Sequence, residues 1–343
     1  MAKSAPVVAR LLLPDDANPA GNVHGGTILQ LMEQAGMIAA TRHCNSKEDD
    51  DFHGEKIAGL ARIETMAFHQ PMFVGEVASL TADIVFTSDR SVLVNVVVTA
   101  QNIAKGTNRI TNTGELWYLS FVPPKDGKEP LIVSVPQVLP PVDDGPALDE
   151  YNKAKCAYEK RKKETASSSE AEGSSCLGID DYKPELDGKK PSENSQTLCQ
   201  LVLPGDCGIS KVAFGGFIMK LMDNAAGCCA YKLCLTNVVT VSITSMDFVN
   251  FVKLGNIVTI DAVPAFSAHK SVEIAVTVSV LSLENKENII VARGNFTFVS
   301  LNKDNKVIPV PRLLLESKAE IEQALIAQKR YEEAKQARLG KKG

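Results

Sequence analysis

The chain contains the same module twice. Residues 21–35 read GNVHGGTILQLMEQA, and residues 211–225 read KVAFGGFIMKLMDNA. The Gly-Gly pair, the Leu-Met pair and the acidic residue after it align at an offset of 190. Solenoid repeats are about 20–50 residues long. A period this long therefore indicates a duplicated domain, and we expect two related halves.

The repeat continues beyond this segment, with one insertion. Met66 corresponds to Met246 and Gly75 to Gly255, at an offset that has dropped to 180. The difference is explained by an acidic segment at 45–51 in the first copy, which we expect to be a solvated loop. A length of 343 residues also favours about two domains. We predict a first domain with a trailing helix at 5–165, a flexible linker rich in Ser, Lys and Glu at 166–197, and a second domain with its own trailing helix at 198–340.

Each module combines one long apolar helix with four strand-like segments. The helix after Gly26 and its counterpart after Gly216 are apolar nearly all round, which is typical of a buried helix. The segments that follow are rich in Val, Ile, Thr and Phe and are joined by short turns. They are 57–68, 77–87, 92–100 and 109–121 in the first copy, and 238–248, 257–267, 272–281 and 289–301 in the second. The sequence predicts an α+β fold in which an antiparallel sheet wraps around a buried central helix.

The composition excludes several classes of function. The chain is 44% hydrophobic and 23% charged, as soluble globular proteins are. Its net charge of -4 leaves no basic surface for general nucleic-acid binding. We expect neither a signal peptide nor a membrane span, because residues 1–10 have no apolar stretch of the needed length and no run approaches about 18 apolar residues. The eight cysteines show no C-x-x-C spacing, so we expect reduced, mostly buried thiols of a cytosolic protein and no metal site.

An acidic residue lies inside each apolar helix. Glu33 is the only acid between His24 and Cys44, and Asp223 is the only acid in the equivalent helix. A buried acid is costly unless it is paired or functional. The glycines before each helix allow a ligand to approach the free N–H groups at the helix start, where a developing oxyanion can be held. The carboxylate and these donors are the two parts needed to hydrolyse an activated acyl group.

The two copies differ in the polar group that precedes the helix. Asn22 supplies an amide in the first copy, and Val212 takes its place in the second. Within one module, acid and helix start lie about 10 Å apart along the axis. If the copies pair by a pseudo-twofold axis, two composite combinations arise, Asn22 with Asp223 and Val212 with Glu33. Only the first has both groups, so we predict one working site per chain.

Several motifs resemble a known family, the cytosolic double-hotdog acyl-CoA thioesterases of the brain-type long-chain class. They are LPDDAN at 13–18, GNVHGG at 21–26, RHCN at 42–45, WY at 117–118 and KLMD at 220–223. The resemblance covers about 10–140 and 198–315, and it implies a tandem double hotdog fold and chains assembled as a trimer of six modules. It also implies hydrolysis of medium- to long-chain fatty acyl-CoA in the cytosol to free fatty acid and CoA, with no cofactor, and places the catalytic pair on Asn22 and Asp223. The second copy departs from the family pattern at 211–216, on the combination that already lacks the amide.

The residues suggest a mechanism. Asn22 and the backbone N–H of Gly26 would polarise the thioester carbonyl, with Gly25 and Gly26 contacting substrate. Asp223 would then activate water as a general base or attack directly to form a transient anhydride. Arg90 and Lys270 occupy equivalent turns and are candidates to bind the CoA phosphates, although solvated turn charges are the default reading.

Other functions stay open at this point. His24 with a partner acid could serve a hotdog dehydratase or hydratase, although this does not explain Asn22, and structural packing near the helix start is the favoured role for His24. A second alternative is a non-catalytic acyl-CoA sensor whose site has decayed. The absence of a G-x-S-x-G motif argues against a serine hydrolase.

Overall fold

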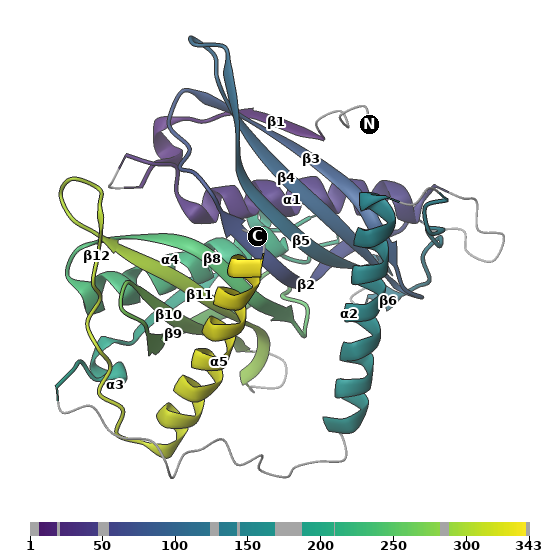
Figure 1. The fold of residues 1–343 in the computed structure, drawn as a ribbon. Coiled ribbons are helices and arrows are strands. Elements are labelled where there is room, and N and C mark those ends of the chain that lie inside the picture. Colours follow the sequence, from purple (N-terminus) through teal and green to yellow (C-terminus); the bar gives the residue numbers. More distant parts are fainter. Residues whose placement is uncertain are drawn as a thin grey trace. The chain divides into compact units, whose positions relative to one another are not determined.

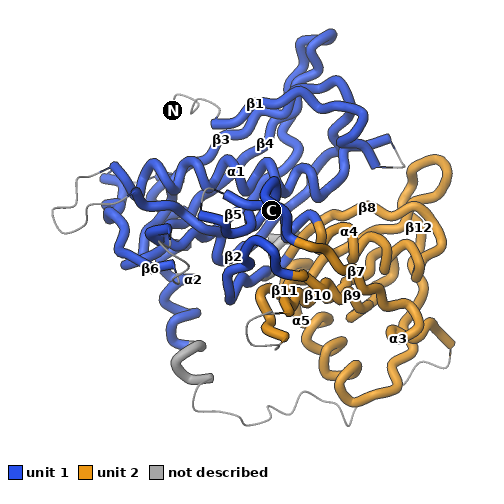
Figure 2. Tube along the Cα trace, turned by 180° about the vertical axis from the view of Figure 1, so that it is seen from behind, with its two compact units in different colours: residues 1–173, 202–220, 244–256 blue, residues 174–201, 221–243, 257–343 orange. Residues whose placement is uncertain are grey.

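The structure is a computed structural model that describes residues 7–18, 21–46, 55–123, 130–142, 145–168, 187–208, 210–281 and 288–340. The chain divides into two compact units (Figure 2). Unit 1 comprises residues 1–173, 202–220 and 244–256, and unit 2 comprises 174–201, 221–243 and 257–343. The start of the second copy, including its Gly-Gly pair, is therefore counted with unit 1.

Unit 1 holds the first sheet and its helix (Figure 1). Its antiparallel strands follow the order β1-β3-β4-β5-β2, and a short strand β6 pairs with β5. The strands are β1 (Val8–Leu11), β2 (Ile57–Phe68), β3 (Glu76–Thr87), β4 (Ser91–Asn102), β5 (Thr107–Val122) and β6 (Leu131–Ile132). Helix α1 (Gly25–Cys44) packs against β2, β3, β4 and β5.

The core of unit 1 lies between α1 and the sheet. Val94, Val96 and Val98 alternate along β4 with their side chains completely buried, as do Leu29 and Met32 on α1. Alternation on a strand and apolar residues all round a helix are the patterns expected when a sheet covers a buried helix. The predicted α+β arrangement is therefore confirmed in this unit.

Unit 2 repeats the arrangement. Its strands are β7 (Gln196–Leu201), β8 (Asn237–Phe248), β9 (Ile257–Ser267), β10 (Ser271–Leu281) and β11 (Asn288–Leu301), in the order β8-β11-β10-β9-β7, with β12 (Val307–Ile308) on β11. Only residues 237–243 of β8 are counted with this unit. Helix α4 (Gly215–Cys234) enters this unit at Leu221. The side chains of Met222, Ala225, Ala226 and Cys229 are fully buried. A sheet with a buried central helix in each half is the tandem hotdog fold, as predicted.

A trailing helix follows each sheet. Helix α2 (Pro146–Ser168) packs Ala154, Tyr151 and Tyr158 against Phe86 and Trp117 of unit 1. Helix α5 (Lys318–Gly340) packs against β9 in unit 2. Helix α5 begins with a capping box, in which Ser317 N donates to Glu320 Oε2 over 2.9 Å and Glu320 N donates to Ser317 Oγ over 3.2 Å.

The segments expected to be loops are described only in part. Of the acidic insertion at 45–51, residues 47–51 lie outside the described residues, as do 169–186 of the expected linker. Beyond that gap, Pro191–Asn194 form the short helix α3, and β7 begins at Gln196. None of the described helices combines the length and the apolar character needed to cross a membrane.

One expectation about the cysteines is wrong. All seven described cysteines are free thiols, but only Cys44 and Cys229 are buried, while Cys156, Cys199 and Cys228 are exposed. Cys199 lies on the edge strand β7 and Cys156 on the trailing helix α2, two elements with a solvent-facing side. The absence of a C-x-x-C pattern led us to expect reduced thiols, but it carried no information about the burial of these residues.

Candidate functional site

The segment before α1 is held in place by a series of backbone and side-chain bonds. Asp16 accepts from Arg10 Nη2 over 2.7 Å and from Leu13 N over 2.9 Å, and its carbonyl accepts from His24 N over 2.7 Å. Asn22 forms an isolated antiparallel β-bridge with Phe73, and its backbone N–H donates to Asn18 Oδ1 over 3.2 Å. These contacts fix the backbone of Asn22 just before the first turn of α1.

His24 caps the first helix. Its Nδ1 accepts from the N–H of Gly26 over 3.0 Å. The ring thus supplies an acceptor for one of the first backbone N–H groups of the helix, which have none within the helix. This contact supports the structural role of His24. It also means that the Gly26 N–H, which the sequence-based mechanism gives to the thioester carbonyl, has a partner within the chain.

The start of α4 has the same frame with different side chains. Phe214 N donates to Asp206 O over 2.9 Å, as His24 N does to Asp16 O, and Val212 bridges to Lys253. Phe214 stands in the position of His24 and has no acceptor atom in its side chain. The second helix start has therefore lost both the amide of the first copy and its capping ring.

The two helix starts cross through their glycines within unit 1. A β-carbon built on Gly26 would lie 2.8 Å from Lys220 Cγ, and one built on Gly216 would lie 2.9 Å from Gln30 Cα. Gln30 and Lys220 are equivalent positions of the repeat. Each helix start therefore contacts the other helix at the equivalent position. Glycine is required at both positions because any side chain would collide with the other helix.

The crossing brings Glu33 to the start of α4. A β-carbon on Gly216 would lie 3.3 Å from Glu33 Oε2, and the Glu33 side chain is buried. Its Oε2 atom has no hydrogen-bond partner. Burial raises the pKa of the carboxyl to about 7, and the nearby backbone N–H of Gly216 partly opposes this rise. Glu33 is thus a buried carboxyl that is part protonated near neutral pH.

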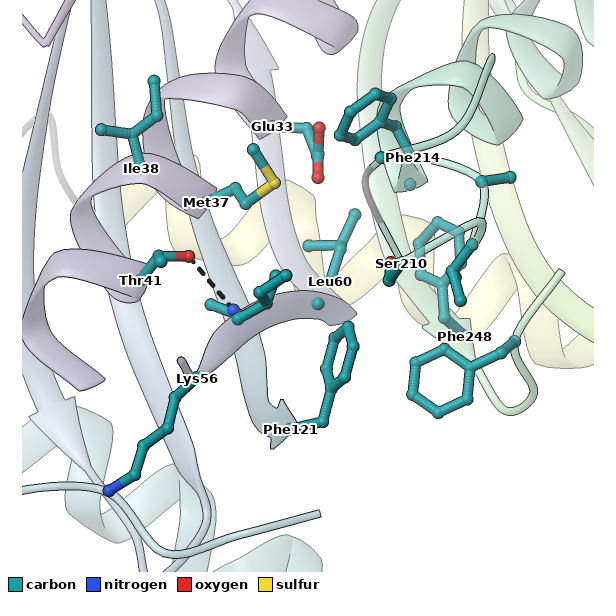
Figure 3. A pocket seen from close by; sticks show the side chains of 18 of the residues that line it. Glu33, Met37, Ile38, Thr41, Lys56, Leu60, Phe121, Ser210, Phe214 and Phe248 are labelled. Carbon is teal, nitrogen blue, oxygen red and sulfur yellow. Dashed lines mark hydrogen bonds between the residues drawn. The ribbon is translucent and has the colours of Figure 1, made fainter. Parts of the chain in front are cut away.

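A cavity of about 520 Å³ opens beside Glu33, and all of its lining residues belong to unit 1 (Figure 3). Figure 3 shows the carboxyl group of Glu33 directed into the space beside Phe214 and Leu60. The walls are mainly apolar and include Met37, Ile38, Leu60, Phe121, Phe214 and Phe248. Val212 and Glu33, the combination that lacks the amide, therefore line one pocket.

The predicted catalytic pair is divided between the units. Asn22 lies in unit 1 and Asp223 in unit 2. Asp223 is buried on α4, and its Oδ1 accepts from Thr240 Oγ1 of β8 over 2.8 Å. A hydroxyl bond of this kind fixes the orientation of the carboxylate. The Thr240 contact was not predictable from the sequence pattern, because β8 and α4 meet only in the fold.

The candidate phosphate-binding residues lie in exposed turns. Arg90 is paired with its neighbour Asp89, with 3.3 Å between Nε and Oδ2, and does not line the pocket at Glu33. Lys270 lies in the equivalent turn of unit 2 and is also exposed. Within the described ranges, no group of three or more His, Cys, Asp and Glu side chains could hold a metal ion.

Similarity to known proteins decides the family. A model of the thioesterase superfamily matches residues 20–107 and 210–282. The cytosolic acyl coenzyme A thioester hydrolase of Rattus norvegicus is 37% identical over 333 residues, which are 96% of this chain and 81% of that protein. The chain belongs to the family of cytosolic acyl coenzyme A thioester hydrolases.

A second relative and a solved structure are consistent with this family and its fold. The cytosolic acyl coenzyme A thioester hydrolase of Homo sapiens is 36% identical over 96% of this chain and 81% of its own length. A solved structure from Lactobacillus plantarum, named provisionally as an oleoyl thioesterase, covers 88% of this chain and 99% of its own with a TM-score of 0.53. At 12% identity, that likeness concerns the fold alone. The family resemblance predicted from the motifs is confirmed.

Proposed function

We propose that this protein hydrolyses acyl-CoA thioesters to a free carboxylic acid and CoA. The observation that carries this proposal is the 37% identity to the rat acyl-CoA thioester hydrolase across 96% of the chain. We extend it to medium- and long-chain fatty acyl groups such as palmitoyl, on the resemblance of the motifs to the long-chain class. The word cytosolic in the names of the relatives supports a cytosolic location.

The working site in this proposal consists of Asn22 and Asp223. Its support comes from the symmetry of the repeat. Gly216 meets Gln30, and Glu33 follows one helical turn later beside the same glycine. Gly26 meets Lys220 in the same way, and Asp223 follows Lys220 by the same three residues. In this proposal Asp223 takes the role in its combination that the symmetry gives to Glu33 in the other, and it acts on the thioester together with Asn22.

Each residue then has a role in the reaction. The side-chain amide of Asn22 donates to the thioester oxygen, and Gly25 and Gly26 give the carbonyl close access to the helix start. Asp223, oriented by Thr240, takes a proton from water as the water oxygen attacks the carbonyl carbon. The C–S bond breaks, the proton passes to the departing thiolate, and the products are a carboxylic acid and a thiol. Direct attack by Asp223 to form an anhydride is the alternative route to the same products.

The backbone N–H groups at the start of α1 can contribute to the reaction only if the hydrogen bonds of this helix start change. The Gly26 N–H donates to His24 Nδ1, so it can bind the carbonyl only by sharing this bond or by leaving it. The capping contact at Nδ1 supports a structural role for His24. Asn22 is therefore the main donor in this mechanism.

Arg90 and Lys270 complete the proposed substrate contacts. Both are exposed cations at equivalent turns, and the phosphates of CoA require such groups. Substitution of each residue by Ala, singly and together, should raise the KM for acyl-CoA and leave kcat nearly unchanged. An unchanged KM in the double variant would remove both from the substrate site.

We also propose that the chains assemble, as a trimer of double-hotdog chains. Unit 1 exposes an apolar strip formed by Leu11, Leu13, Phe73 and Val74, each at least 40% exposed. The bonds from Leu12 N to Glu76 O and from Gly75 N to Leu12 O bring these two segments together. Exposed apolar strips of this kind favour association. Light scattering on the purified chain measures the mass, and a monomer would overturn this part of the proposal.

Release of free thiol from palmitoyl-CoA tests the activity. We expect turnover by the wild-type chain and a large loss in Asp223→Asn, which keeps the shape of the side chain and removes the base. Binding of palmitoyl-CoA without any release of CoA would instead favour a sensor. Activity toward enoyl-CoA or hydroxyacyl-CoA without thiol release would favour a hydratase.

A further inference from the structure

The pocket at Glu33 has no role in the proposed reaction, yet it is a formed cavity. Thr41 Oγ1 on α1 accepts from Ala58 N on β2 over 3.1 Å. Asn45 binds the backbone of Lys56 in both directions, with Nδ2 to O at 2.9 Å and N to Oδ1 at 3.1 Å. These bonds join the two elements that form one wall. This wall of the cavity is therefore fixed by hydrogen bonds to the backbone.

The opposite wall is aromatic. Phe121 and Phe251 pack with ring centroids 5.3 Å apart, and Phe214 and Phe248 line the same space. A β-carbon on Gly59 would lie 2.9 Å from the Phe121 ring, so this glycine makes room for the ring. A largely apolar cavity of about 520 Å³ lies within the size range of small-molecule sites. Its chemistry suits an aliphatic chain.

One polar atom inside the cavity needs a partner. Glu33 Oε2 is buried without a hydrogen bond, and Figure 3 shows the carboxyl group directed into the space. Buried polar atoms in native proteins are usually satisfied, and an exception calls for an explanation. The Tyr118 hydroxyl donates to the backbone oxygen of Glu33 over 2.9 Å, so it does not serve the side chain. The backbone N–H of Gly216 lies near the carboxyl and lowers its pKa, but Oε2 has no hydrogen bond of normal geometry. A ligand that donates a hydrogen bond would therefore complete the contacts of this oxygen.

The pocket disfavours a reacting thioester. Val212 stands where the first copy has its amide, and Phe214 where it has its capping histidine. A thioester carbonyl only accepts hydrogen bonds, and without an amide in this copy only the protonated fraction of Glu33 has one to donate. A carboxylic acid differs, because two carboxyl groups that share one proton form a charge-assisted hydrogen bond. The aliphatic walls and the unpaired carboxyl together fit a fatty acid.

We propose that the cavity beside Glu33 is a second, non-catalytic site that binds a medium- or long-chain aliphatic carboxylic acid, with the ligand carboxyl sharing a proton with Glu33. The chain of the ligand lies along Met37, Leu60 and the phenylalanines. This ligand belongs to the class of product that the proposed function releases, and in that respect the inference rests on the proposed function. The site itself is separate from Asn22 and Asp223.

Other ionisable groups bear on the pH dependence of this site. Arg42, Glu55 and Lys56 also line the cavity, and Tyr118 packs against Glu33 from β5. The pKa of the Tyr118 hydroxyl is raised by burial and by the Glu33 charge, so this group stays protonated near neutral pH. Glu33 itself, with a pKa of about 7, is the group that changes charge there. Above this pKa the bound pair must take up one proton, so affinity should fall about tenfold per pH unit.

Calorimetry with dodecanoic acid on the full chain tests the proposal, with methyl dodecanoate as the matched ligand that cannot donate. We expect the acid to bind at a site that Glu33→Leu weakens by about 10- to 100-fold, because the charge-assisted bond is lost. Methyl dodecanoate should bind that site poorly. In buffers of different ionisation enthalpy above pH 7, binding to wild type should show proton uptake. In the Glu33→Gln variant, the glutamine amide can still donate a hydrogen bond to the ligand carboxylate. Binding should therefore persist, but without proton uptake.

Separate variants keep this inference apart from the proposed function. Glu33→Leu should keep thioester hydrolysis while losing the site, and Asp223→Asn should lose hydrolysis while keeping Glu33-dependent binding. Met37→Trp fills the cavity and should also abolish that binding, whereas Ile103→Trp, at an exposed position of the same unit, should not. Equal binding of acid and methyl ester, or binding unaffected by both Glu33→Leu and Met37→Trp, would overturn the proposal.

Discussion

The hydroxyl group of Tyr118 occupies the space that a side chain on Gly36 would need. A β-carbon on Gly36 would lie 2.3 Å from the Tyr118 oxygen, and that oxygen donates to the backbone carbonyl of Glu33 over 2.9 Å. Both residues are buried. The pair fixes the turn of α1 that carries Glu33 against β5, and it requires glycine three residues after the acid.

Substitution of Gly36 should therefore destabilise unit 1. We expect Gly36→Ala to lower the free energy of unfolding by about 1–3 kcal/mol, the usual cost of overpacking a core. Gly145→Ala is the matched control, because a β-carbon there meets open space. Urea denaturation followed by circular dichroism measures both. Equal stability of the two variants would show that the Tyr118 contact is not tight.

The stability of the protein should fall with pH because of Glu33. Burial raises its pKa from 4.5 to about 7, so between these values the folded protein binds more protons than the unfolded chain. This contribution is fully present below pH 4.5 and is lost as the pH rises through 7. Its size is on the order of 3 kcal/mol. Glu33→Gln should flatten the pH profile of unfolding in this window, whereas Glu55→Gln, at an exposed position, should leave the profile as in the wild type.

The two repeat combinations should differ in catalysis. Asn22→Ala should lower kcat by about 10²–10³, the usual effect of removing one oxyanion donor. Asp223→Ala should lower it by about 10²–10⁴, the contribution of a general base. Glu33→Ala should have a much smaller effect. Thiol release from palmitoyl-CoA gives all three rates, and similar losses from Glu33→Ala and Asp223→Ala would contradict a single working site.

The ion pair between Arg330 and Glu273 should hold α5 on the sheet of unit 2. Arg330 donates to Glu273 Oε1, and burial raises the pKa of this carboxyl while Arg330 opposes the rise. Arg330→Ala leaves a buried carboxyl without its cation and should cost about 1–3 kcal/mol. Lys329→Ala, at the exposed neighbouring position, should cost little. Thermal unfolding compares them, and the double change Arg330→Leu with Glu273→Leu should recover part of the loss.

The sequence predicted the regular elements because their patterns are local. All eight predicted strands are present, and β2 and β9 have the predicted bounds. Four strands were missed. The residues of β1 and β7 at the sheet edges are mostly exposed and show no alternation, and β6 and β12 are only two residues long. An edge strand is recognised by its partner, β3 or β9, which the sequence does not specify.

The candidate site was predictable only as a set of residue types. Comparison of the two copies identified Asn22, Glu33, Val212 and Asp223 as the positions that matter. The contacts around them depend on packing between distant segments. The bond from Gly26 N to His24, the bond from Thr240 to Asp223 and the cavity beside Glu33 left no pattern in the chain. The catalytic roles of Asn22 and Asp223 stay predictions.

The replacement of His24 by Phe214 at the second helix start illustrates what fusion of two modules into one gene permits. In an assembly of identical single modules, each mutation appears at every equivalent position, so losing the histidine cap or the amide would inactivate all sites together. On a fused chain the mutation is confined to one copy. The combination of Val212 and Glu33 can then drift toward another task while the proposed combination of Asn22 and Asp223 is kept.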